Sequence, residues 1–316
     1  MGENTSRAKV MVALVGVGPT WELHYREAIE RLSSKLTVRA VCDSVQMRAA
    51  VVADEYEASV VACPWQLTQR TDLHAWIILD PGWFDTYPAD LAVRSGRPAL
   101  LASTFSLSIP RLTGILRRSL DQGETLMPEF PQRYTAATNR LRELMVTRLG
   151  RVRRIVVTVP RPVSDPASVA EWLEEDPSYA ISLFDWCACL IGDCSTGATF
   201  AVTPTGAQLQ LHFPSKTSRP DDAPHVILRF HAAETCLRHI ECERGAATIT
   251  SPTQIAWQTS DEYGQETLIH ERSPHEIILD QFCRRALGGL VPVPTLNHAL
   301  QAIAMSQFAL ESLKKS

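Results

Sequence analysis

The sequence predicts an α/β protein of two domains, a doubly wound parallel sheet followed by an α/β domain with a mostly antiparallel sheet. An apolar run that ends in glycines, residues 9–18, is typical of a parallel strand buried on both faces. Strands then alternate with helical patterns up to residue 130, as in βαβ units. Short alternating strands follow one another between residues 197 and 272, which favours an antiparallel sheet. We therefore expect domains at 1–130 and 131–316.

The first domain divides into strand and helix pairs in chain order. "KVMVALVGVG" is the first strand, and "YREAIERLSSKL" places Tyr25, Ile29, Leu32 and Leu36 at helical spacing with charges between them. The alternation continues through residues 36–43, 47–58, 75–80, 87–96, 98–103, 108–123 and 125–130.

The second domain has a different texture. Residues 133–150 form a long helical pattern and 151–159 a strand, and residues 168–192 predict one or two helices broken near Pro177. Strands such as "QLQLHF" and "HVILRF" come next, and two helices near 274–287 and 295–313 end the chain.

Composition excludes several classes of function. A chain of 316 residues with 45% hydrophobic and 21% charged residues can bury a full core, and its net charge of -4 supplies no basic footprint for nucleic acid. No apolar run approaches the ~20 residues that cross a bilayer, so we expect a cytoplasmic protein without membrane contact. The 8 cysteines contain no CxxC pair, so we expect reduced thiols and no metal site.

The segment "GVGPTW" follows the first strand, where a dinucleotide-binding protein keeps its phosphate loop. Gly16 and Gly18 fit a tight turn and close approach to a pyrophosphate at a helix N-terminus. Trp21 stands at the third glycine position, so the helix must start differently or stand further from the strand. Glu22 adds a carboxylate in the first turn, which would repel a phosphate there.

An acid closes the second strand at the distance expected for ribose binding. Asp43 follows Gly18 by about 25 residues, and an acid there favours NAD by repelling the 2′-phosphate of NADP. Ser44 and Arg48 nevertheless keep NADP possible. The alternative is that the two glycines only make a turn and Asp43 caps the next helix.

Eight segments, taken in order, carry a resemblance over almost the whole chain. They are "VALVGVG" with "HYREAIERL", "VRAVCDS", "AWIILDPGW", "DLAVRSGRPALL", "PQRYTAATNRLRELMVTRLGRVRRI", "SLFDWCACLIGD" and "VPVPTLNHALQAIAMSQFALESLKKS". In this order they resemble the Gfo/Idh/MocA family, the glucose-fructose oxidoreductase and inositol dehydrogenase type. The resemblance implies a Rossmann-like NAD(P)-binding domain, hydride transfer on a sugar, polyol or derivative, and a cleft between the domains. It places Asp80 and Pro81 at the cofactor site, where the family has a Thr-Pro pair.

The departures from the family pattern concern its chemistry. The family's catalytic lysine, in a Glu-Lys-Pro motif, aligns with Ser103, and its histidine aligns with Ser182 if Asp185 is the following aspartate. The acid one turn earlier aligns with Ser178. An isolated serine hydroxyl cannot take a proton near neutral pH without an activating base.

Four side chains remain as weak catalytic candidates, because the resemblance brings their segments toward the cleft: Tyr179, Asp185, Glu129 and Arg133. Tyr25 or Tyr87 would line the cofactor side. Each also has a structural interpretation: a partly buried tyrosine, a helix cap or tertiary hydrogen bond for Asp185, and an ion pair between Glu129 and Arg133.

Two functions follow from these observations. One is an NAD(P)-binding oxidoreductase, with NAD slightly favoured and a small molecule as substrate. The other is a non-catalytic relative that binds a ligand or partner in the same cleft. An open sheet face in the second domain would make a homo-oligomer plausible.

Overall fold

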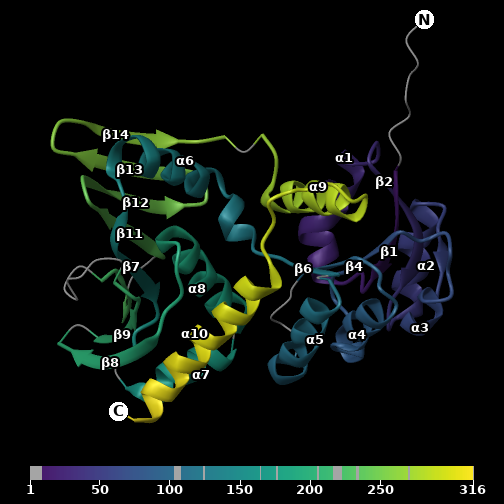
Figure 1. Ribbon diagram of the computed structural model, residues 1–316, viewed down its shortest axis with the longest axis horizontal. Helices are drawn as coiled ribbons and strands as arrows, with labels where there is room; N and C mark the ends of the chain where they lie inside the picture. The colour runs from purple at the N-terminus through teal and green to yellow at the C-terminus, as the bar shows by residue number, and fades with distance from the viewer. Residues whose placement is uncertain are drawn as a thin grey trace, which may run out of the picture. The chain divides into compact units, whose positions relative to one another are not determined.

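The protein is described by a computed structural model that covers residues 9–102, 108–123, 125–163, 165–175, 177–204, 206–215, 223–232, 235–269 and 271–315. The chain forms two compact units (Figure 1). The first comprises Met1–Glu129 and Arg272–Leu300, and the second comprises Phe130–Glu271 and Gln301–Ser316. The predicted α/β class, a parallel sheet followed by a mostly antiparallel one, is confirmed.

The first unit contains a six-stranded, fully parallel sheet in the order β3-β2-β1-β4-β5-β6. The strands are β1 (Val10–Val15), β2 (Leu36–Cys42), β3 (Ser59–Val60), β4 (Ala75–Ile78), β5 (Ala99–Leu101) and β6 (Leu126–Pro128). From β1 the chain builds outward to β3 and then returns to β4 on the other side of β1. The strand order therefore reverses between β1 and β4, the point at which open parallel sheets bind ligands.

The described helices of this unit connect consecutive strands, apart from the last of them, which comes much later in the chain. They are η1 (Trp21–Tyr25), α1 (Arg26–Arg31), α2 (Gln46–Glu55), α3 (Pro64–Leu67), η2 (Gly82–Phe84), α4 (Tyr87–Arg94), α5 (Ile109–Asp121) and α9 (Pro274–Ala286). β4 is buried along its whole length and β1 at every position but one, as their apolar sequences predict.

The second unit contains an eight-stranded sheet in the order β14-β13-β12-β11-β7-β10-β9-β8. Its strands are β7 (Val152–Pro160), β8 (Gly197–Thr203), β9 (Gly206–His212), β10 (His225–His231), β11 (Leu237–Cys242), β12 (Gly245–Ser251), β13 (Gln254–Thr259) and β14 (Tyr263–Thr267). Only the pairing of β7 with β10 is parallel among the described strand pairs of this sheet.

The remaining helices are η4 (Pro131–Tyr134), α6 (Ala136–Leu144), η5 (Met145–Leu149), α7 (Pro166–Glu175), α8 (Pro177–Ile191) and α10 (Leu296–Lys314). One face of the sheet is apolar because alternate residues of its strands are apolar, as Leu209 and Leu211 of β9 illustrate. These residues share one core with Phe184 and Trp186 of α8.

The structure corrects the expectation of one continuous domain from residue 131 to 316, because Arg272–Leu300 belongs to the first unit. An ion pair of 2.5 Å between Lys35 Nζ and Asp280 Oδ1 joins the end of the α1 segment to α9. The long helix expected over 133–150 is divided into η4, α6 and the π-helical turn η5.

The remaining expectations on composition concern thiols, metal and membrane. All cysteines are free thiols. Across the described residues, no cluster of side chains has the makings of a metal site, and none of their helices has the length and apolarity to span a membrane.

Candidate functional site

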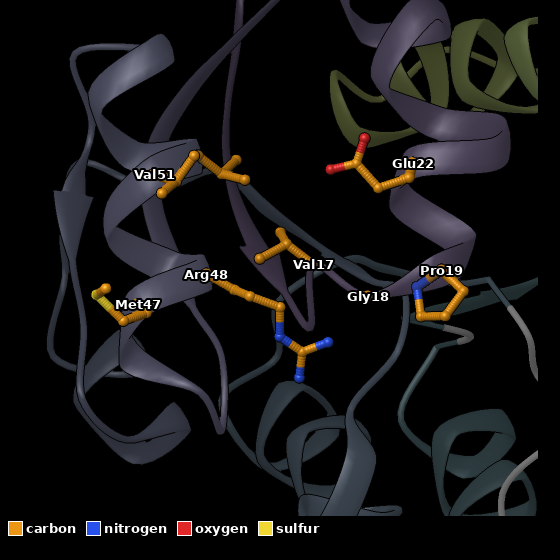
Figure 2. A pocket seen from close by; sticks show the side chains of 8 residues that line it. Val17, Gly18, Pro19, Glu22, Met47, Arg48 and Val51 are labelled. Carbon is orange, nitrogen blue, oxygen red and sulfur yellow. The ribbon is translucent and has the colours of Figure 1, made fainter.

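A pocket of about 440 Å³ opens in the first unit beside the carboxyl ends of β1 and β2. Its lining comes from the loop after β1, from η1 and from α2, namely Val17, Gly18, Pro19, Glu22, Met47, Arg48, Val51 and Val52. In Figure 2 the α2 side chains face Glu22 and Pro19 across the pocket, with Val17 between the two sides. The walls are apolar, and the polar groups at the pocket are the Arg48 guanidinium and the Glu22 carboxylate. Apolar walls with a few polar groups are typical of small-molecule sites.

Asp43 holds the two loops at the base of this pocket. Its Oδ2 accepts a hydrogen bond from the Val17 N–H at 2.7 Å, and its Oδ1 accepts one from the Val45 N–H at 2.7 Å. Arg48 Nη2 lies 3.2 Å from Oδ1, and the Asp43 side chain is buried. The predicted ribose-binding acid is therefore already engaged by three donors, and it orients Arg48.

The turn after β1 requires glycine at position 16 and leaves little room for a side chain at position 18. Gly16 has φ +78, and a Cβ there would lie 1.9 Å from the carbonyl oxygen of Asp80. A Cβ on Gly18 would lie 3.1 Å from Asp80 Oδ2. The close approach that these glycines permit is thus made to Asp80, at the end of β4.

The Asp80 carboxylate occupies the mouth of this turn. Its Oδ2 accepts a hydrogen bond from the Thr20 N–H at 2.7 Å, and its Oδ1 accepts one from the Thr20 hydroxyl at 2.6 Å. Pro19, the preceding residue, has no N–H to offer. A dinucleotide's pyrophosphate binds such a turn through backbone N–H groups at the start of the helix. The turn does not fit this pyrophosphate well, because Pro19 has no N–H, the Thr20 N–H is bound to Asp80 and a carboxylate stands there.

Trp21 changes the start of the following helix, as the sequence predicts. The helix begins with the π-helical turn η1, and the Trp21 ring is fully buried and packs edge-on against Tyr56 at 5.9 Å. Pro81 is buried and precedes the 3-10 turn η2; it is not part of the pocket lining.

In the second unit, Arg133 and Asp185 are brought together. Arg133 Nε donates to Asp185 Oδ2 at 2.7 Å and Nη2 donates to Oδ1 at 2.5 Å, with both side chains buried. Burial raises the pKa of the Asp185 carboxyl, and Arg133 acts against this rise. This edge of the Arg133 guanidinium, Nε and Nη2, is thus used by Asp185.

The other α8 candidates lie along the same helix. Ser178, Ser182 and Asp185 share one face at spacings of four and three residues. Tyr179 packs edge-on against Trp172, and its hydroxyl lies 3.5 Å from Cys236 Sγ. Burial, followed by Cys236, raises the pKa of Tyr179 to about 12, so the phenol stays protonated near neutral pH. Ser103 lies outside the described residues.

Glu129 belongs to a buried cluster of the first unit that the sequence did not predict. The Tyr25 hydroxyl donates to Glu129 Oε1 at 2.8 Å, and His275 Nε2 of α9 lies 3.4 Å from the same oxygen. The His24 ring stacks on His275 at 4.3 Å. Burial and then His24 lower the pKa of His275 to about 4, so its ring is neutral at pH 7.

No protein-family model and no curated protein sequence matches this chain. Solved structures do match. An oxidoreductase from Thermotoga maritima is 14% identical with TM-score 0.76 and covers 97% of both chains. UDP-N-acetylglucosamine 3-dehydrogenase from Acidithiobacillus ferrooxidans is 16% identical with TM-score 0.72, covering 98% of this chain and 99% of its own. A Gfo/Idh/MocA family oxidoreductase from Vibrio cholerae is 14% identical with TM-score 0.70, covering 97% of this chain and 98% of its own.

These matches run over nearly the full length of both partners, and at such identities they establish the fold. The resemblance inferred from the eight segments is confirmed at the level of the fold. The chain has the fold of the Gfo/Idh/MocA-type oxidoreductases.

Proposed function

We propose that this chain binds an adenine nucleotide in the pocket of its first unit and does not transfer hydride. The observation that carries the proposal is the position of Arg48, which projects from α2 at an apolar pocket beside the ends of β1 and β2 (Figure 2). Nucleotide-binding proteins with a doubly wound sheet place the adenosine at this location.

The lining offers a matching group for each part of an adenosine nucleotide. Val17, Met47 and Val51 supply apolar surface for the base. Glu22 supplies a carboxylate that accepts hydrogen bonds from ribose hydroxyls. Arg48 supplies guanidinium donors for a phosphate. Only one edge of the guanidinium lies near Asp43, so its other N–H groups are directed elsewhere. A volume of about 440 Å³ is in the range of small-molecule sites.

The absence of hydride transfer rests on the second unit. Oxidation of an alcohol needs a group that accepts its proton near neutral pH. Ser178 and Ser182 offer hydroxyls in place of the family's acid and histidine, and Asp185 on the same helix face is bound at two points by Arg133. A carboxylate held in this way is a structural group.

The second candidate function is NAD(P)-dependent oxidation of a sugar, polyol or derivative. It is favoured by solved structures of the same fold, one of which is named a UDP-N-acetylglucosamine 3-dehydrogenase. In this case the nicotinamide cofactor would have to displace Asp80 from Thr20.

Calorimetric titration with adenosine 2′-monophosphate tests the proposal. We expect micromolar to submillimolar binding that weakens about tenfold in Arg48→Gln, the loss of one charged hydrogen-bonding group. The matched control is Arg94→Gln, which removes an exposed arginine of α4 that pairs with Asp90, and which leaves the affinity unchanged. Reduction of NAD+ or NADP+ in the presence of any member of a polyol and sugar panel would contradict the non-catalytic part.

A further inference from the structure

Asp80 stands at the carboxyl end of β4, beside β1, where the strand order of the first sheet reverses. We propose, on the basis of the proposed function, that Asp80 makes this site select adenine mononucleotides against dinucleotides. The selection is made at the turn after β1, and the mononucleotide is held in the neighbouring pocket around Arg48.

The Asp80 carboxylate occupies the space beside Thr20 and Gly18. Both Asp80 oxygens face Thr20, with 2.7 Å from Oδ2 to the Thr20 nitrogen and 2.6 Å from Oδ1 to its hydroxyl. Oδ2 also lies 3.1 Å from the position that a Gly18 Cβ would take. The carboxylate therefore fills the open side of Gly18, which is the space that a glycine at this position leaves for a phosphate.

Three backbone positions near this turn offer a phosphate no unoccupied N–H group. Pro19 has no N–H, the Thr20 N–H is bound to Asp80, and the Val17 N–H is bound to Asp43. The Glu22 N–H points to the Gly18 carbonyl at 3.3 Å. An incoming pyrophosphate would have to displace a carboxylate to obtain the Thr20 donors.

The negative charges near this turn also oppose a pyrophosphate. A pyrophosphate at this turn would meet the Asp80 carboxylate at contact distance and the Glu22 carboxylate from the pocket side. Like charges at such separation repel strongly where water is partly excluded. A single phosphate on the ribose, directed to Arg48 on the α2 side, avoids the Asp80 carboxylate, and the Asp43 carboxylate beside Arg48 is already paired with the guanidinium. The ligand class is thus adenosine carrying one phosphate monoester.

The experiment compares affinities by calorimetry for adenosine 2′-monophosphate, adenosine 5′-monophosphate and NADPH. In the wild-type protein we expect the mononucleotide whose phosphate reaches Arg48 to bind at least about tenfold more tightly than NADPH, because only the dinucleotide must bring a pyrophosphate to the Asp80 carboxylate. The Asp80→Asn variant removes the charge with little change in shape. It should tighten NADPH at least about tenfold and leave the mononucleotide within about twofold.

Two further variants make the result specific. Asp72→Asn removes a carboxylate at the other end of β4, where Asp72 pairs with Arg70, and should leave all three affinities unchanged. Asp80→Thr provides a second replacement if the asparagine variant does not fold, as judged by its thermal unfolding.

The outcomes separate the two proposals. One outcome is that a mononucleotide binds while its affinity relative to that of NADPH is the same in Asp80→Asn as in the wild-type protein. This result would overturn the selection role and leave nucleotide binding in place. Equal affinities of the wild-type protein for NADPH and for the more tightly bound mononucleotide would also overturn the selection role. Failure of every variant to bind any of the three nucleotides would overturn both proposals.

Discussion

The Arg133 guanidinium and the Asp185 carboxylate form a two-point, buried ion pair between η4 and α8, with donor–acceptor distances of 2.7 and 2.5 Å. The aspartate that the family resemblance places in the chemistry is thereby fixed as a structural partner. Arg133 also lies over the Phe130 ring at 5.1 Å, so the pair is packed as well as hydrogen-bonded.

Asp185→Asn should destabilise the protein without affecting nucleotide binding. Loss of one member of a buried pair leaves an uncompensated charge, which costs about 3 kcal/mol of unfolding free energy. Urea unfolding measures this loss, and calorimetry measures the nucleotide affinity. Glu262→Gln removes an exposed pair with Arg148 and should change stability by less than about 0.5 kcal/mol. A stable Asp185→Asn protein with altered ligand affinity would contradict the structural role.

Gly16→Ala should be strongly destabilising. The substitution forces a Cβ to within 1.9 Å of the Asp80 carbonyl oxygen at a backbone φ of +78. We expect a loss of several kcal/mol of unfolding free energy, since both steric overlap and backbone strain contribute.

Gly114→Ala is the matched control. Gly114 lies inside α5, and a Cβ there would meet no atom within 4 Å. Alanine should stabilise this helix by about 0.5 to 1 kcal/mol. Equal effects of the two substitutions on thermal unfolding would show that the Asp80 backbone does not constrain Gly16.

Trp21→Gly should not restore a dinucleotide site, although it completes the glycine pattern. The Trp21 side chain is fully buried, and its removal leaves a cavity that costs about 3 to 5 kcal/mol. NADPH affinity should stay at the wild-type value because Asp80 is unchanged. Trp83→Ala, at a position that is 78% exposed, controls for loss of a tryptophan. Tight NADPH binding by a folded Trp21→Gly protein would place the block at Trp21 instead.

Asp280→Asn should reduce the acid sensitivity of the fold. Burial would raise the pKa of the Asp280 carboxyl, but Lys35, Arg284 and Arg272 outweigh burial and hold this pKa below its usual value. A carboxyl with a lowered pKa contributes stability above its unfolded pKa, and this contribution is lost as the pH falls through about 4 toward the folded pKa.

The measurement is the free energy of unfolding from pH 6 to pH 3. Asp280→Asn should lower it near neutral pH by about 1 to 3 kcal/mol and should flatten its decline below pH 4. A variant whose curve runs parallel to the wild-type curve would show that Asp280 does not carry this pH dependence.

The fold was predictable because hydrophobic periodicity reports burial directly. The apolar run before Gly16 is β1, and the strand and helix order of the first unit follows from the same pattern. Arg272–Leu300 was assigned to the wrong unit because the pattern of α9 predicts a helix but not its neighbour. Its contact with Lys35 joins residues 245 positions apart.

The site was predictable in location and not in detail. Gly18 and Arg48 line the pocket, and Asp43 lies at the end of β2 as expected. The orientation of the Asp80 side chain toward Thr20 depends on two loops 60 residues apart, so no local sequence pattern predicts it. An aspartate in place of the threonine of the Thr-Pro pair was the available signal. The cofactor, the cytoplasmic location and the homo-oligomer remain predictions.

The most direct measurement is a side-by-side calorimetric titration of the wild-type protein with adenosine 2′-monophosphate and NADPH, which share the same adenosine phosphate. The account predicts that adenosine 2′-monophosphate binds and that NADPH binds at least about tenfold more weakly, because the Asp80 carboxylate stands where its pyrophosphate would lie. NADPH binding that is tighter than that of the mononucleotide would contradict the account and restore the dinucleotide site.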